Sequence, residues 1–174
     1  IKIQQAILQA LPIHTLSPET TDGKQPFIHP TAVKGNLENA ELSFILRSFT
    51  REEMDRLEDI LEAICVRVNK DFPNSKLEVI FKEQYRNMKE KLDEFPQVVD
   101  YAMEAVTRAG VTPIRTSIRG GTDGSRLSFM GLPCPNIFAG EHAFHSKQEW
   151  VSIQDMERAV DTIVHLAVIW EEKS

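Results

Sequence analysis

Hydrophobic residues recur at helical spacing in several stretches of the chain, and the polar residues beside them supply helix starts and stops. Thr50 followed by Glu53 has the spacing of a capping box, and Ser152 stands three residues before Asp155 in the same way. The pattern predicts helices over residues 1–11, 50–70, 95–108, 125–130 and 152–167.

Alternating apolar and polar positions predict strands between these helices. Phe27–Gly35 and Glu41–Phe49 read as an antiparallel hairpin with one buried face, preceded by an exposed loop over Ser17–Pro26. A third strand is predicted over Lys76–Gln84, where Leu77, Val79 and Phe81 alternate with charged residues. Two shorter strands are predicted over residues 112–118 and 133–138, and residues 139–150 are predicted to form a loop.

The order of these elements predicts an α/β protein with two parts, residues 1–90 and residues 91–174. The first part reads as a ferredoxin-like α+β unit that lacks its first strand. The second alternates strand and helix, which is typical of a three-layer α/β sheet, but its two strands are too few for a stable sheet. The chain begins at Ile1 within a predicted helix and without a methionine, so we expect both parts to belong to larger domains.

Composition narrows the function classes. The 174 residues carry a formal net charge of −6, which argues against a large surface for nucleic acid or anionic membranes. No stretch approaches the roughly 20 apolar residues of a membrane-spanning helix. Cys65 and Cys134 lack the spacing of metal ligands, so two reduced thiols in a cytoplasmic protein are expected.

A glycine-rich turn, Arg119–Gly124 (RGGTDG), is the first candidate for chemistry. It lacks the lysine of a phosphate-binding loop, and it is compatible either with a tight strand-to-helix turn or with close approach of a ligand. Arg119 would stand at the end of a predicted strand, where a guanidinium can hold a carboxylate through two hydrogen bonds. Arg47 ends another strand, either as an edge charge or as a side chain that reaches into a cleft.

The segment Gly140–Trp150 carries two histidines, His142 and His145, in a predicted loop. An imidazole can bind zinc, but two histidines three residues apart are an incomplete ligand set, and the spacing alone favours an exposed histidine loop.

Residues 118–150 (IRGGTDGSRLSFMGLPCPNIFAGEHAFHSKQEW) resemble the C-terminal signature of the peptidase T family, aminotripeptidases of the dizinc exopeptidase superfamily. The segments SPETTDG, LRSF and YRNMKE also resemble segments of that family, in the same order. The resemblance implies a lid and dimerisation domain over residues 1–90 and the last part of a catalytic domain over 91–174.

The resemblance also implies residue roles and a cofactor. His145 matches the family's last zinc ligand, and Arg119 and Arg47 match arginines that meet the peptide substrate. Two zinc ions per active site, a small peptide substrate and a homodimer formed through the lid are implied. The other zinc ligands and the catalytic glutamate of the family have no counterpart in these residues, so the isolated chain is expected to be inactive.

Two other functions remain open from the sequence. Residues 1–90 alone fit a non-catalytic dimerisation or ligand-binding module. A related dipeptidase or deacylase would also fit the zinc-exopeptidase resemblance.

Overall fold

The computed structural model describes all 174 residues, and the chain folds as two units. One unit contains Ile1–Gln84 together with Ser117–Gly120, and the other contains Tyr85–Thr116 and Gly121–Ser174. Both helices and strands are present, as the sequence predicts, so the protein is of mixed α/β type. No helix is both long enough and apolar enough to cross a membrane.

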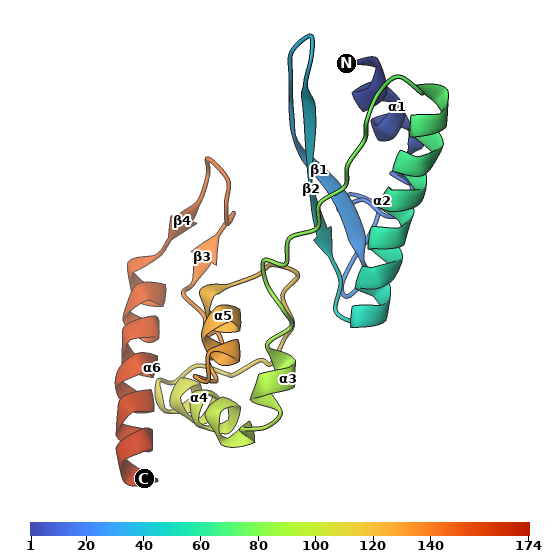
Figure 1. Cartoon of the computed structure of the whole chain (residues 1–174). Helices are drawn as coiled ribbons and strands as arrows, with labels where there is room; N and C mark the ends of the chain where they lie inside the picture. The colour runs from blue at the N-terminus through green and yellow to red at the C-terminus, as the bar shows by residue number, and fades with distance from the viewer. The chain divides into compact units, whose positions relative to one another are not determined.

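The first unit is a two-stranded hairpin against which two helices pack (Figure 1). β1 (Phe27–Gly35) and β2 (Ala40–Arg47) pair antiparallel, with an irregularity in the register between Pro30 and Ala32. The helices are α1 (Lys2–Ala10) and α2 (Arg51–Asp71). The backbone N–H of Glu53 donates to Thr50 Oγ1 at 3.3 Å, so the predicted cap of α2 is confirmed.

The core of this unit lies between α2, α1 and the hairpin. It consists of seven buried aliphatic residues: Ile7, Leu11, Ile28, Leu57, Leu61, Ile64 and Val68. The buried amide of Gln4 on α1 donates to two backbone carbonyls of the hairpin, those of Lys34 at 2.8 Å and Glu41 at 3.1 Å. A polar side chain at a core position is therefore satisfied by the backbone of the strands it covers.

The second unit is built around two helices, α4 (Pro96–Arg108) and α6 (Ile153–Glu172), which pack against each other (Figure 1). Its smaller elements are α3 (Lys89–Leu92), α5 (Asp123–Phe129), β3 (Glu141–His142) and β4 (Trp150–Val151). Ser152 caps α6 by accepting the N–H of Asp155 at 3.0 Å, as predicted. At the far end of α6, Trp170 meets the edge of the Tyr101 ring with centroids 4.9 Å apart.

One face of α6 is apolar and exposed. Its members are more than half exposed: Ile153, Met156, Val160, Ile163 and Val164. The buried face carries Thr162 and Ile169, both fully covered, and Thr162 donates to the carbonyl of Arg158 within the helix. The helix therefore has apolar residues on two sides, and α4 covers only one of them.

Three predicted strands are wrong. Residues 76–84, 112–118 and 133–138 form no strand. The sheet of the first unit has only β1 and β2, so the predicted ferredoxin-like unit lacks the strand expected after α2. Alternating apolar residues indicate only that one face of a segment could be buried. A strand also needs a neighbouring strand whose backbone N–H and C=O groups pair with its own. Ile80 and Ile114 illustrate the reason, because they remain 68% and 79% exposed with no strand beside them.

The predicted loop over residues 139–150 is also wrong in part. Its ends form the short antiparallel pair β3–β4, in which Glu141 pairs with Val151 and His142 pairs with Trp150. Cys65 and Cys134 are free thiols, as expected. Burial raises the pKa of the Cys65 thiol, with a smaller contribution from Glu62, so this cysteine is a weak nucleophile on α2.

Candidate functional site

Arg119 is held by the loop that precedes β1. Its Nη1 donates to the carbonyl of Thr21 at 2.9 Å, and its Nη2 donates to Thr21 Oγ1 at 2.7 Å and to the carbonyl of Gln25 at 3.2 Å. The guanidinium carbon lies 4.5 Å from the centre of the Phe27 ring, at cation–π distance. Three of the five guanidinium donors are thus used, while the Nε–H is buried without a partner.

Arg47 stands at the same end of the hairpin. It is the last residue of β2 and the register partner of Phe27, the first residue of β1. Both predicted substrate arginines are therefore neighbours of Phe27: Arg119 covers its ring, and Arg47 is paired with it across the two strands. The structure brings these two arginines to one strand end, although they are 72 residues apart in the chain.

The three glycines of the RGGTDG turn differ in how much space surrounds them. A Cβ on Gly121 would lie 2.1 Å from a ring carbon of Tyr85, and a Cβ on Gly124 would lie 2.6 Å from the carbonyl oxygen of Cys134. A Cβ on Gly120 would meet nothing within 4 Å. Packing within the chain thus explains two of the glycines, and the side next to Gly120 is open.

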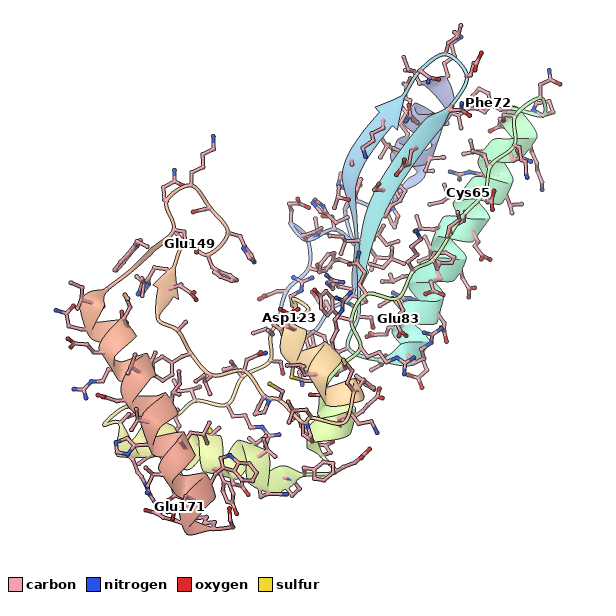
Figure 2. The ribbon with its side chains drawn as sticks, turned by 60° about the vertical axis from the view of Figure 1, so that its left-hand side comes forward. Cys65, Phe72, Glu83, Asp123, Glu149 and Glu171 are labelled. Carbon is pink, nitrogen blue, oxygen red and sulfur yellow. The ribbon has the colours of Figure 1, made fainter.

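His145 lies in the loop between β3 and β4, together with Glu149, which Figure 2 labels. Its φ of 63° is in the left-handed region, and its backbone N–H donates to Glu149 Oε2 at 2.6 Å. The imidazole is exposed and stands 3.8 Å from the Phe144 ring, centre to centre. The loop therefore presents the imidazole at the surface, and the Glu149 carboxylate holds the backbone that carries it.

The base of this loop is fixed to α6. The His142 ring stacks on Trp150 with centroids 4.2 Å apart and planes 14° from parallel. Gly140 has a φ of 84°, and a Cβ there would lie 2.3 Å from the Cβ of Asp155. Only glycine fits at this position, because the chain passes directly over the first turn of α6.

The residues of this chain do not complete a zinc site. No group of three or more His, Cys, Asp or Glu side chains is placed to hold a metal ion, whereas zinc takes three or four protein ligands. His145 offers one imidazole, so this chain can supply at most part of such a site through that loop.

Sequence reasoning missed Phe27 and Thr21 as parts of the site. Their signal is weak, since an aromatic residue at a strand start and a threonine in a polar loop are common in any fold. Only the return of residues 117–120 to the first unit places Arg119 beside them.

No family model matches the chain. Curated relatives do match: it is 41% identical to peptidase T of Lysinibacillus sphaericus over 157 residues, which are 90% of this chain and 38% of the relative. It is 42% identical to peptidase T of Clostridium botulinum over 156 residues, again 90% and 38%. It is 39% identical to peptidase T of Geobacillus thermodenitrificans over all 174 residues, which are 42% of that protein.

A solved structure supports the fold. The aminopeptidase PepT from Bacillus cereus superposes with a TM-score of 0.55 over 95% of this chain and 45% of its own, at 17% identity. The chain thus spans about two fifths of the length of the curated relatives it matches. With about 40% identity to several peptidase T proteins along nearly its whole length, the chain is similar to one part of the peptidase T proteins.

Proposed function

We propose that the full-length protein is an aminopeptidase that removes the N-terminal residue of tripeptides, with this chain supplying substrate contacts and one zinc ligand. The relationship to peptidase T supports a peptidase. The placement of Arg119 over the ring of Phe27, whose register partner is Arg47, is the observation that carries the substrate contacts.

In this proposal the two arginines bind the carboxylate end of a small peptide. Charge-assisted hydrogen bonds from a guanidinium to a carboxylate are about twice as strong as neutral ones. Because Thr21 and Gln25 already accept from Nη2 of Arg119, this arginine would donate through its remaining Nη1 hydrogen. Both side chains are half-buried, so the contact would be formed partly out of water, where it is less screened.

We further propose that His145 contributes its imidazole to a zinc site whose remaining ligands come from the part of the family that this chain does not span. The exposed imidazole at the end of a loop suits a ligand that joins others from elsewhere. The isolated 174-residue chain would then hold zinc weakly and hydrolyse no peptide.

The test uses the full-length protein with trialanine as substrate. Arg47→Ala and Arg119→Ala are expected to raise KM about tenfold or more, as the loss of a charged hydrogen bond does. His145→Ala is expected to lower the zinc content after dialysis, and His142→Gln, in β3 at the base of the loop, is the control that keeps it. Unchanged zinc content in His145→Ala would refute the ligand assignment, and absence of trialanine cleavage by the wild-type protein would refute the activity.

A further inference from the structure

Hydrogen bonds hold the loop before β1 at its ends and within it. The loop therefore supports Arg119 rigidly. The backbone N–H of Ile28 donates to the carbonyl of Leu16 at 2.8 Å, so the two ends of the loop meet. Within the loop, Gln25 and Asp22 exchange two hydrogen bonds: the N–H of Asp22 donates to Gln25 Oε1 at 2.8 Å, and the N–H of Gln25 donates to the carbonyl of Asp22 at 3.0 Å.

Thr21 links this loop to the guanidinium. Its hydroxyl donates to the carbonyl of the buried Ser17 at 2.6 Å, which leaves the oxygen lone pairs directed to accept from Arg119 Nη2 at 2.7 Å. Its own carbonyl accepts from Nη1 at 2.9 Å. One residue thus accepts hydrogen bonds from both terminal nitrogens of the guanidinium, and the Phe27 ring lies beneath its carbon.

An arginine side chain has many rotamers, and ordering it on binding has an entropic cost. Contacts that hold the guanidinium before the ligand arrives remove that cost from the binding step. The two guanidinium donors that Thr21 and Gln25 leave unused then have a fixed position. One of them, the Nε–H, is buried, so the second hydrogen of Nη1 is the donor that remains for a ligand.

We infer that Thr21 is a positioning residue that orients Arg119 for the carboxylate of a small peptide. The inference rests on the proposed function, because it assigns Thr21 an effect on substrate only through Arg119. Thr20 is a matched neighbour: its hydroxyl donates to the carbonyls of Ile13 and Ser17 at 3.2 and 3.3 Å and does not contact Arg119. A role in loop structure alone would make the two threonines equivalent.

The experiment compares Thr21→Val, Thr21→Ser and Thr20→Val in the full-length protein with trialanine. Thr21→Val keeps the side-chain shape and removes the hydroxyl, so KM is expected to rise about fivefold to tenfold with kcat within a factor of two. Thr21→Ser keeps the hydroxyl and should restore the wild-type KM. An equal rise in KM for Thr21→Val and Thr20→Val would overturn the inference.

The same substitutions in an Arg119→Lys background separate positioning from any direct effect. Lysine cannot make the forked contact, so Thr21→Val should add less than twofold to the KM of Arg119→Lys. A full additional rise would show that Thr21 acts independently of Arg119 and would refute the proposal.

Amide hydrogen exchange of residues 17–26 gives a readout that does not depend on catalysis. Arg119→Lys and Thr21→Val should each speed exchange of this segment, because both break the contact between loop and guanidinium. Unchanged exchange in both variants would refute the contact itself. If the wild-type protein cleaves no trialanine but exchange rises as expected, the proposed activity fails while the support of Arg119 by Thr21 stands.

Discussion

Adding one methyl group to adjacent glycines should have opposite consequences for stability. A Cβ on Gly121 would lie 2.1, 2.2 and 2.8 Å from three carbons of the Tyr85 side chain, one of them its Cβ. A Cβ on Gly120 would meet nothing within 4 Å, and Gly120 does not have a positive φ. Rotating the Tyr85 ring would not relieve this overlap, because the overlap includes the Cβ of Tyr85.

The magnitude follows from the difference between the two variants. Both replacements reduce the entropy of the unfolded chain by the same amount, which stabilises by about 0.4–1 kcal/mol. Gly121→Ala in addition overpacks its site, which costs about 1–3 kcal/mol. The free energy of unfolding should therefore be about 1–3 kcal/mol lower for Gly121→Ala than for Gly120→Ala. At about 2–4 °C per kcal/mol, the Tm of Gly121→Ala should be several degrees lower.

Thermal unfolding followed by circular dichroism measures this difference. Tyr85→Ala in the Gly121→Ala background is the matched test, because removing the ring removes the clash and the two changes should be strongly non-additive. Equal Tm values for the two glycine variants, or additive effects of Tyr85→Ala and Gly121→Ala, would refute the steric explanation of this glycine.

Three further predictions concern the two units separately. Leu57→Ala should lower the free energy of unfolding by about 2–5 kcal/mol, since Leu57 is fully buried, and chemical denaturation would measure it. Ser152→Ala should cost about 0.5–2 kcal/mol by removing the cap of α6, whereas Ser152→Asp should retain stability. Arg108 holds the pKa of Glu172 below its ordinary value, so this contribution to stability is present above the ordinary carboxyl range near pH 4.5 and is lost as the pH falls through it. Arg108→Gln should therefore flatten the dependence of Tm on pH between about 3 and 6, and an unchanged pH profile would contradict the ion pair.

Five of the six helices and the first hairpin could be predicted because their signals are local, whereas the short helix α3 was missed. Thr50 and Ser152 each form the cap that their spacing indicates, and helix bounds followed from the apolar stripes. The strand over residues 76–84 could not be judged in this way, because a strand depends on a partner that local pattern does not reveal.

The sequence pointed to the two arginines of the candidate site but not to the residues that hold Arg119 in place. Arg47 and Arg119 were singled out by their places at the ends of predicted strands, and resemblance to a family then implied their role. Thr21 became visible only when the structure placed it against Arg119, at 2.7 Å and 98 positions away in the sequence. Such a contact depends on tertiary folding. The periodicity and composition of a sequence do not show which single residues will meet in this way.

The exposed apolar face of α6 has a consequence for heat capacity. The chain exposes 12415 Å², whereas two separate compact bodies of half its mass each would expose about 10,400 Å². Because apolar surface that is already hydrated adds nothing to ΔCp or to the denaturant m-value on unfolding, both quantities should be low for a chain of this length. Its unfolding transition in urea should accordingly be broad, and its stability should vary little between cold and warm conditions.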